Sequence, residues 1–338
     1  MDNFHTVIIG AGPAGLQCAA TLAAQGCKVI VLERQKVIGP KICAGGIPHH
    51  ALHDLRLPAE LIEKVFHTQH IYTPWQRAVL KEKEPVIATV DRKNLGQWML
   101  QQAREKGAIV LNNAPVIKVD KASVYLKDRK IAYQYLVGAD GSSSLVRRYL
   151  NIATTKQGAG INYQIPVKMA NMEWHLNPRA FNSGYAWVFP HGQTTSVGIY
   201  AERRDVPPQQ LFGRFCLWAK ENKISLNDAK LGAALINFDY QGWNFGNTFL
   251  AGDAAGIASG FTGEGIYPAI VSGRTIAKSI ITPGHDPRRL KRLIKKQQQH
   301  NRLQKFFTGN KVICQITLEM LVLAVRSGLI KFDLLEIY

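Results

Sequence analysis

The chain contains 338 residues, of which 46% are hydrophobic and 20% are charged, so its composition excludes a disordered chain and fits one large or two ordinary globular domains. The formal net charge of +18 at pH 7 suits an anionic membrane face, a phosphorylated substrate or an acidic protein partner. We expect no nucleic-acid partner, because no nucleic-acid-binding module accompanies this charge, and no metal site, because the five cysteines are scattered without a Cys-x-x-Cys pair.

The N-terminal segment predicts a strand at residues 6–9, a glycine-rich turn, a helix at 16–25 and a second strand at 28–32. The turn reads Gly-x-Gly-x-x-Gly, whose glycines allow a tight turn, close approach to a pyrophosphate and close packing of helix on strand. The helix would point its positive N-terminus at the phosphates, and Glu33 would accept hydrogen bonds from a ribose diol. The predicted dinucleotide cradle consists of Gly10, Gly12, Pro13, Ala14, Gly15, Glu33 and Arg34.

The following segments extend this unit. Residues 48–88 are of mixed character and are interpreted as an insertion. Residues 89–111 predict a turn, a long amphipathic helix, a glycine C-cap and a strand. Residues 122–137 alternate as in a hairpin, and a buried strand then ends in the Gly-Ala-Asp-Gly turn at 138–141.

Residues 151–240 are rich in predicted strands, with candidates at 159–168, 186–189 and 195–200. Tyr185, Trp187 and Phe189 alternate along one strand, which places three aromatic rings on one face. Two interpretations stay open: an apolar wall beside a cofactor, and ordinary core packing between this sheet and the cofactor domain.

The segment FLAGDAAGIASGFTGEGIYPAI at residues 249–270 returns to the glycine-rich pattern. Gly252, Gly263 and Gly265 would let the backbone approach a bound ring closely. Beyond residue 283 the chain is predicted to be helical.

Several of these motifs together support a family resemblance. GAGPAG, VDR at 90–92, GADG at 138–141 and AGDAAG with its TGEGI extension resemble flavoproteins of the p-hydroxybenzoate hydroxylase-like fold. KICAGG at 41–46 and GYAWVFPHG at 184–192 resemble the cysteine-and-glycine loop and the Y-x-W-x-F-P motif of the geranylgeranyl reductase family. The chain departs from the family at Ala44, where members often carry glycine. The resemblance covers roughly residues 5–280 and implies FAD as the cofactor.

The resemblance also implies roles for matching residues. Asp253 would hydrogen-bond the ribityl chain or a phosphate-side hydroxyl, and it could also cap a helix N-terminus, which is compatible with that role. The N–H groups of Gly265 and Ile266 would face the pyrimidine end of the flavin, where donors stabilise the anionic reduced ring. Arg92 would contact the cofactor, or else open a helix as a surface charge. The implied cofactor-binding residues beyond the cradle are Lys41, Cys43, Ala44, Gly45, Arg92, Asp140, Gly141, Gly252, Asp253, Gly263, Gly265 and Ile266.

Two further assignments have alternatives. Asp140 and Gly141 match a second fingerprint near the pyrophosphate and ribose, but could also form only a β-turn. Cys43 could touch the flavin face, pair with another thiol or fill space; with no histidine beside it in the sequence to activate a thiolate, a pocket-lining role is preferred over covalent catalysis. The catalytic groups are left unassigned, with pocket candidates Cys43, Tyr185, Trp187 and Phe189.

These patterns predict an α/β protein with a Rossmann-type FAD-binding domain, an inserted antiparallel β-sheet substrate domain and a helical C-terminal tail. The FAD-binding domain would comprise residues 1–150 and 246–282, the substrate domain 151–245, and the basic and apolar tail 283–338.

The resemblance implies a reductase that transfers hydride from reduced FAD to a carbon–carbon double bond of a geranylgeranyl or other polyprenyl substrate. Its external electron donor would be NADPH or a reduced ferredoxin or flavodoxin, an acidic carrier that a basic surface attracts. One alternative is a flavin-dependent monooxygenase on the same fold. The other is a non-catalytic flavin-binding protein associated with a membrane or an electron-transfer complex.

The tail bears on location. Residues 288–305 contain no acidic residue, which fits a solvated helix face as well as a functional basic patch. Residues 312–325 are apolar but too short to span a bilayer, and they include Gln315 and Glu319. They would lie on an anionic membrane or pack on the cofactor domain. With no N-terminal signal peptide expected, the prediction is a cytoplasmic protein, peripheral on the inner face of the membrane if the tail binds it.

Overall fold

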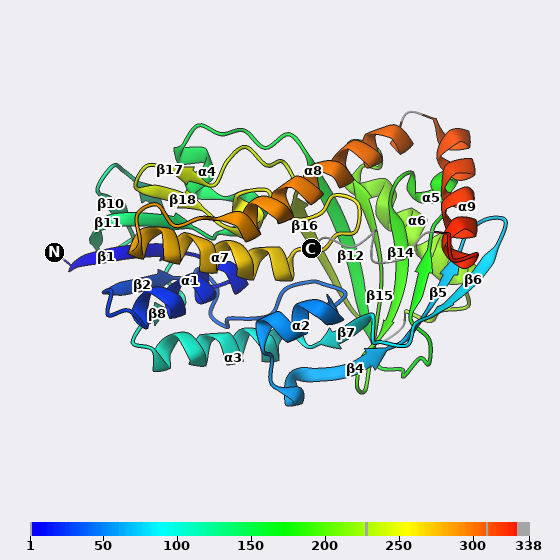
Figure 1. Cartoon of the computed structure of the whole chain (residues 1–338), viewed down its shortest axis with the longest axis horizontal. Coiled ribbons are helices and arrows are strands. Elements are labelled where there is room, and N and C mark those ends of the chain that lie inside the picture. Colours follow the sequence, from blue (N-terminus) through cyan, green and yellow to red (C-terminus); the bar gives the residue numbers. More distant parts are fainter. Residues whose placement is uncertain (1, 227–228, 309, 330–338) are drawn as a thin grey trace.

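The computed structural model describes residues 2–226, 229–308 and 310–329. Within this part of the chain the strands form two large sheets and one small one. Figure 1 shows the large sheets at opposite ends of the molecule, one around β1 (Asp2–Ile9) and the other around β15 (Thr195–Glu202). This is the mixed α/β architecture that the sequence predicts.

The first large sheet is mostly parallel. It follows the order β17 (Asn244–Phe245), β18 (Thr248–Leu250), β11 (Lys130–Gly138), β1, β2 (Val29–Leu32) and β8 (Ile109–Leu111). The short strands β9 (Lys118–Val119) and β10 (Ser123–Tyr125) extend β11 in antiparallel fashion. Every residue of β2 is buried, because a parallel sheet is covered on both faces.

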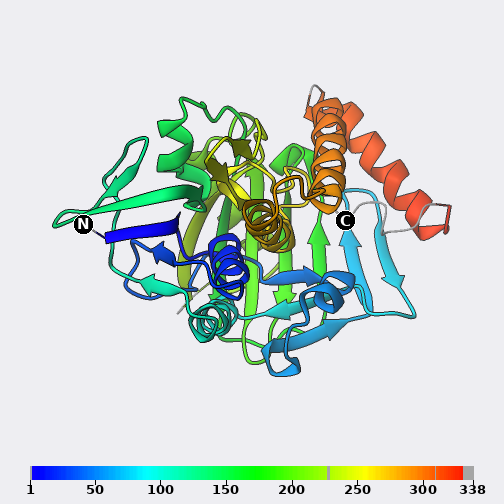
Figure 2. The ribbon, with the colours of Figure 1, turned by 60° about the vertical axis from the view of Figure 1, so that its left-hand side comes forward.

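Helix α1 (Pro13–Ala23) packs directly against α7 (Ile266–Ile281), so the two ends of the cofactor region meet. An ideal Cβ on Gly273 of α7 would lie 2.1 Å from the carbonyl oxygen of Ala14, and only glycine permits this approach. Helix α3 (Arg92–Glu105) packs on the other side of α1. Figure 2 shows α1 and α7 side by side in the centre of the molecule.

The second large sheet follows the order β16 (Lys230–Asn237), β12 (Gln157–Ile165), β15, β14 (Tyr185–Pro190), β13 (Glu173–His175), β5 (Thr68–Tyr72) and β6 (Arg77–Lys81). Its neighbours pair antiparallel except β13 and β5, which are parallel. Helix α6 (Pro208–Glu221) and the short α5 (Pro178–Phe181) cover the face that carries Ala186 and Val188.

The remaining elements join the two halves. A small antiparallel sheet contains β3 (Gly46–Pro48), β7 (Ile87–Val90) and β4 (Ile62–Phe66). The short helices between strands are α2 (His49–Leu55), α4 (Leu145–Tyr149) and the 3-10 turns η1 (Ala59–Leu61), η2 (Gly141–Ser143) and η3 (Gly252–Ala254).

The C-terminal part forms two helices. Helix α8 (Arg288–Thr308) rises obliquely from the middle of the molecule to the upper right in Figure 1, and α9 (Lys311–Arg326) lies at the right-hand end. Helix α9 packs on β6 and α5, and its buried Glu319 accepts hydrogen bonds from Thr73 Oγ1 (2.6 Å) and Gln76 Nε2 (2.8 Å). Of the helices in the described residues, none is long and apolar enough to cross a membrane.

The elements predicted from the sequence correspond to observed ones, with three differences. The first helix begins at Pro13, whose missing N–H is tolerated in a first turn, and ends at Ala23. The second sheet gains β5 and β6 from the segment interpreted as an insertion, because strand partners far apart in sequence leave no local pattern. Helix α9 packs on β6 and α5 at this sheet, and its Cys314 and Leu318 also contact Phe261 of the predicted cofactor domain. The domain boundaries stay a prediction.

Candidate cofactor site

The glycines of the first turn have distinct structural roles. Gly10 has a φ of +101°, and a Cβ there would lie 2.3 Å from the carbonyl oxygen of Ala139. A Cβ on Gly15 would lie 2.0 Å from the carbonyl oxygen of Gly10. Both positions therefore require glycine for the fold itself.

Gly12 is different, because its glycine is not needed for the protein's own packing. Its φ is −74°, which any residue can adopt, and an ideal Cβ there would meet no non-neighbouring atom within 4 Å. In the described part of the chain, no side chain caps the first turn of α1, whose N–H groups begin at this point. An open space in front of uncapped N–H donors fits a pyrophosphate.

The predicted ribose contact lies at the end of β2. Glu33 Oε2 accepts a hydrogen bond from Ala11 N at 2.7 Å, and Oε1 accepts one from Gln35 N at 2.8 Å. These bonds fix the carboxylate beside the glycine turn and leave further lone pairs for a diol. Arg34, in contrast, is exposed.

Asp140 and Gly141 lie close to the first turn, since a Cβ on Gly10 would lie 2.9 Å from Asp140 Cα. Asp140 Oδ2 accepts hydrogen bonds from Leu145 N (2.6 Å) and Val146 N (3.2 Å), whereas no partner in the described residues contacts its buried Oδ1. Burial raises the pKa of this carboxyl above its ordinary value, and the hydrogen bonds offset only part of that effect. The carboxyl thus has a turn-forming role and a free oxygen.

Arg92 is the first residue of α3 and is half-buried. Its Nε and Nη1 atoms are enclosed, and the described residues provide no hydrogen-bond partner for either. Enclosed N–H donors without an acceptor are costly, so an acceptor from a bound molecule fits at these two atoms. This observation favours the cofactor interpretation of Arg92 over a solvated surface charge.

The motif at 252–265 meets the cysteine loop, which we define as residues 41–46. Asp253 Oδ2 accepts hydrogen bonds from Lys41 Nζ at 2.9 Å and from Ser142 Oγ at 3.1 Å. Its other oxygen lies 3.5 Å from an ideal Cβ on Gly265, just before α7. Three separate segments of the chain therefore converge on Asp253.

The aromatic strand β14 reaches the same motif. Tyr185 Oη donates a hydrogen bond to the carbonyl oxygen of Thr262 at 2.5 Å, and Gly263 has a φ of +68° where a Cβ would lie 2.8 Å from that hydroxyl. Burial raises the pKa of the Tyr185 phenol, as does the nearby Cys43 thiol. The phenol therefore stays protonated at neutral pH.

Tyr185, Trp187 and Phe189 share one face of β14, as predicted, opposite the face that packs on α6. Trp174 links them, with ring centroids 5.2 Å from Tyr185 and 4.8 Å from Phe189. Trp187 and Phe189 are only 5% and 3% exposed, whereas Tyr185 is half-buried. The burial of Trp187 and Phe189 fits core packing, and Tyr185 is the ring nearest the cofactor motif.

The cysteine loop is tied to the second sheet. Asn162 Nδ2 donates to the carbonyl oxygen of Cys43 at 3.3 Å, and Gly45 N donates to Cys43 Sγ at 3.4 Å. No disulfide involves Cys43 or the other four cysteines, all of which are described. Cys43 is half-buried, in agreement with a pocket-lining position.

Sequence reasoning missed the residues of α8 that hold the cofactor motif. Gln297 Nε2 donates to the carbonyl oxygen of Gly256 at 3.1 Å, and His300 Nδ1 lies 3.3 Å from Ser259 Oγ. Burial lowers the pKa of His300 to about 4, with a smaller effect from Lys296. The polar residues at 297, 300, 301 and 304 have helical spacing, but a polar stripe of this kind predicts a solvated face.

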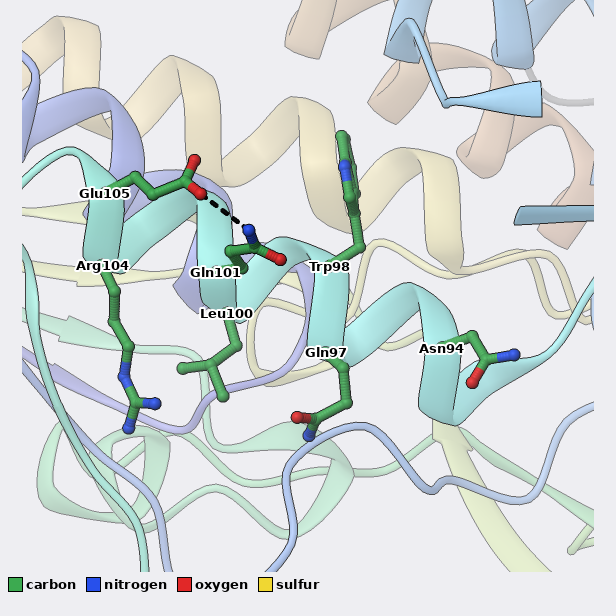
Figure 3. A pocket seen from close by; sticks show the side chains of 7 residues that line it. All are labelled: Asn94, Gln97, Trp98, Leu100, Gln101, Arg104 and Glu105. Carbon is green, nitrogen blue, oxygen red and sulfur yellow. Dashed lines mark hydrogen bonds between the residues drawn. The ribbon is translucent and has the colours of Figure 1, made fainter. Parts of the chain in front are cut away.

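A surface hollow of about 440 Å³ lies elsewhere, on α3. Figure 3 shows the side chains that line it, which all come from this helix and include Trp98, Gln101 and Glu105. Gln101 Nε2 donates to Glu105 Oε1 at 2.7 Å. None of its lining residues belongs to the predicted cofactor set, and most of them are exposed, so the hollow is a shallow feature of one helix.

Comparison with known proteins identifies the family of the chain. The family model described as FAD binding domain matches residues 3–197. The chain is 29% identical over 300 residues to a geranylgeranyl diphosphate reductase from Rhodobacter capsulatus, over 82% of this chain and 75% of that protein. It is 25% identical over 309 residues to a digeranylgeranylglycerophospholipid reductase from Methanocaldococcus jannaschii, over 82% and 78% of the two chains.

A solved structure shares the fold. The geranylgeranyl bacteriochlorophyll reductase-like protein from Thermoplasma acidophilum matches with a TM-score of 0.75 and 21% identity, over 97% of this chain and 90% of that chain. The chain therefore belongs to the FAD binding domain family. It is an FAD-dependent oxidoreductase, and its predicted resemblance to geranylgeranyl reductases is confirmed by these relatives.

Proposed function

We propose that this protein saturates carbon–carbon double bonds of a geranylgeranyl or other polyprenyl chain. When bound, FAD would supply a hydride to one carbon of the double bond, and a proton would be added to the other carbon. The observation that carries the proposal is the contact between Tyr185 and the carbonyl oxygen of Thr262, because it joins the aromatic face of β14 to the motif assigned to the flavin. The names of the relatives support the substrate class.

The residues of the chain would bind and orient the cofactor as follows. The open N-terminus of α1 at Gly12 would receive the pyrophosphate, Glu33 the ribose diol and Asp253 the ribityl chain. The unpaired nitrogen atoms of Arg92 and the unpaired oxygen of Asp140 would each gain a partner. The remaining assigned residues are Pro13, Ala14, Arg34, Lys41, Cys43, Ala44, Gly45, Gly141, Gly252, Gly263, Gly265 and Ile266.

The apolar substrate chain would lie against the aromatic face of β14 at its half-buried member, Tyr185, with Trp187 and Phe189 packed behind it. An isolated double bond is a poor hydride acceptor, so catalysis depends on alignment and on a proton source. Tyr185 holds its proton because burial raises its pKa, and it or a bound water molecule would deliver the proton. Its hydroxyl would have to leave the carbonyl oxygen of Thr262 to do so.

The electron donor would be NADPH or a reduced ferredoxin or flavodoxin. The net charge of +18 supports an acidic carrier, because complementary charge accelerates the encounter of two proteins. Stopped-flow reduction by each donor, repeated at rising salt concentration, separates them: reduction by a protein carrier would slow steeply with salt.

The outer face of α9 supports peripheral attachment to an anionic membrane. One face of the helix packs on the protein through Cys314, Leu318 and Val322, yet large apolar side chains also line the opposite face. Basic residues at each end of the helix, Lys311 and Arg326, would meet anionic head groups. The exposed apolar residues are Val312, Ile313, Ile316, Met320, Leu323 and, on the neighbouring hairpin, Trp75.

Vesicle sedimentation tests this attachment. The protein should pellet with vesicles containing phosphatidylglycerol and remain in the supernatant with neutral phosphatidylcholine vesicles. The variant Ile316→Gln with Met320→Gln, which changes only exposed positions, should bind several-fold more weakly. Equal recovery of the protein in the supernatant with both vesicle types would contradict attachment to an anionic membrane.

The reductase activity is tested anaerobically. The purified protein is loaded with FAD, reduced with dithionite and mixed with geranylgeranyl diphosphate or a geranylgeranyl lipid while the flavin absorbance is followed. Reoxidation together with product masses higher by pairs of hydrogen atoms is the expected result. Reoxidation only after oxygen is admitted, with a hydroxylated product, would favour the monooxygenase, and bound FAD without turnover would favour a non-catalytic flavin protein.

A further inference from the structure

A histidine and a glutamate without a predicted role meet at the cysteine loop. His191 directly follows β14, and Glu63 lies in β4 of the small sheet. His191 Nδ1 lies 2.5 Å from Glu63 Oε2, and its Nε2 lies 3.0 Å from the carbonyl oxygen of Ala44. His191 is 7% exposed, so this ring is held inside the protein between two strands and the loop.

The chemistry of these partners fixes where the protons lie. A carbonyl oxygen only accepts hydrogen bonds, so Nε2 must carry a proton and donate it to Ala44. On the other side, either Nδ1 is also protonated and faces an ionised Glu63, or Glu63 is protonated and donates to Nδ1. In both cases Glu63 orients the ring, and His191 Nε2–H donates to the carbonyl oxygen of Ala44.

The loop is shaped for this contact. Gly45 has a φ of +77°, and an ideal Cβ there would lie 2.6 Å from His191 Cε1. Any side chain at this position would therefore displace the histidine. The loop is also connected to the rest of the site, because Lys41 pairs with Asp253 and the carbonyl oxygen of Cys43 accepts from Asn162.

We propose that His191, oriented by Glu63, is a positioning residue that fixes the cysteine loop and so places Cys43 against the reaction pocket. The importance of this position for turnover rests on the proposed function, whereas the fixation itself does not. His191 acts through the carbonyl oxygen of Ala44. Without its hydrogen bond the loop would open locally while the sheets stay folded. The other bonds of the loop include those of Asn162 and Lys41 and the backbone bond from Val90 N to the carbonyl oxygen of Gly45 at 3.0 Å.

Site-resolved alkylation tests the fixation. The FAD-loaded protein is treated with iodoacetamide, and the modification of each cysteine is followed by peptide mass spectrometry. His191→Leu should raise the alkylation rate of Cys43 by about tenfold or more, the effect expected when a hydrogen bond to a buried group is lost. The buried Cys18 and Cys314 should stay protected, which distinguishes loop opening from general unfolding.

Three matched variants sharpen the result. His191→Gln keeps an N–H donor for Ala44 and should return the rate to within about threefold of the wild type, and Glu63→Gln should do the same because its amide can donate to Nδ1. His175→Leu breaks a second His–Glu pair, in which the buried His175 lies 3.0 Å from Glu173 of the same strand, β13, and it should leave the Cys43 rate unchanged.

Two outcomes would overturn the proposal: an unchanged Cys43 rate in His191→Leu, or a parallel rise at Cys18 and Cys314. The turnover assay is read separately. If the fixation is confirmed and geranylgeranyl substrates are not reduced, the proposed function fails and the positioning role in the loop stands. If substrates are reduced, kcat of His191→Leu should fall and His191→Gln should restore it.

Discussion

Lys41 Nζ and Asp253 Oδ2 lie 2.9 Å apart although 212 residues separate them in the sequence. This ion pair closes the cysteine loop over the downstream cofactor motif. The lysine side chain is 45% exposed and the aspartate 10%, so solvent screens the pair and its contribution to stability is small. Its position, however, is at the ribityl end of the proposed site.

Lys41→Met should therefore affect binding more than folding. We expect the free energy of unfolding of the apoprotein to change by less than about 1 kcal/mol, and the Kd for FAD, measured by quenching of flavin fluorescence, to rise several-fold. Lys291→Met, on the exposed side of α8, serves as the control for loss of one positive charge. An equal weakening in both variants would show that only the overall charge matters.

The glycines at 12 and 15 give opposite predictions. Gly12→Ala should leave the stability of the apoprotein within about 0.5 kcal/mol of the wild type, because the added methyl group meets no protein atom. It should still weaken FAD binding by at least tenfold, since that space is assigned to the pyrophosphate.

Gly15→Ala should instead destabilise the apoprotein by about 1–3 kcal/mol, because its methyl group collides with Gly10. Urea unfolding and FAD titration of each variant check both statements.

The buried ion pair of Arg147 and Asp239 is hydrogen-bonded to the cofactor motif. Arg147 and Asp239 are 1% and 0% exposed, and Arg147 Nη1 also donates to the carbonyl oxygen of Ala254 at 3.2 Å. Burial alone would raise the pKa of Asp239, yet hydrogen bonds from Thr155 and Gln241, with the charge of Lys156, bring it below its ordinary value.

Arg147→Met should cost about 3–5 kcal/mol of unfolding free energy, because it leaves the buried Asp239 carboxylate without one of its two cations, the other being the more exposed Lys156. The double variant Arg147→Met with Asp239→Asn should recover part of this loss. Arg148→Met, at an exposed neighbouring position, should change stability little. Equal effects at positions 147 and 148 in urea unfolding would contradict the role given to the buried pair.

His300 predicts a pH dependence of stability. Its pKa is about 4 in the folded protein, against 6.5 for an exposed histidine, so the unfolded chain binds a proton first as pH falls. The stability that the neutral ring provides is complete above about pH 6.5, decreases between 6.5 and 4, and is lost below 4, with a total on the order of 3 kcal/mol.

The groups that face this ring are Ser259, the ring of Phe261 and the charge of Lys296. His300→Gln removes the titration. The difference in unfolding free energy between wild type and variant should be constant above pH 6.5 and should shift in favour of the variant at lower pH. A difference that does not vary between pH 7 and 4.5 would contradict the lowered pKa.

Glu319 anchors α9 to the hairpin between β5 and β6, where it accepts hydrogen bonds from Thr73, Trp75 N and Gln76. Glu319→Ala should release the helix and accelerate tryptic cleavage at Lys311 by about tenfold or more, because hydrogen bonds to a charged acceptor are among the stronger ones. Glu319→Gln keeps one acceptor oxygen and should show an intermediate rate. An unchanged cleavage rate in Glu319→Ala would show that apolar contacts alone hold α9 on the protein.

The sequence determined the local parts of this protein. The glycine-rich turns, the strand at residues 29–32, the hairpin at 123–138 and the aromatic face of β14 follow from backbone requirements and from two-residue alternation, which act over a few neighbouring positions. The same motifs were sufficient to predict the family, because the two glycine-rich segments, at 10–15 and 252–265, are both typical of binding to one dinucleotide cofactor.

Tertiary structure decided which of these parts meet. The pairing of β5 with β13, the contact of Tyr185 with Thr262 and the His191–Glu63 pair join segments that are far apart in the sequence. The partner of His191 cannot be predicted from the residues around position 191, because Glu63 lies 128 positions earlier in the sequence. The polar inner face of α8 likewise satisfies backbone groups of a distant loop, a requirement that exists only once the fold has buried them.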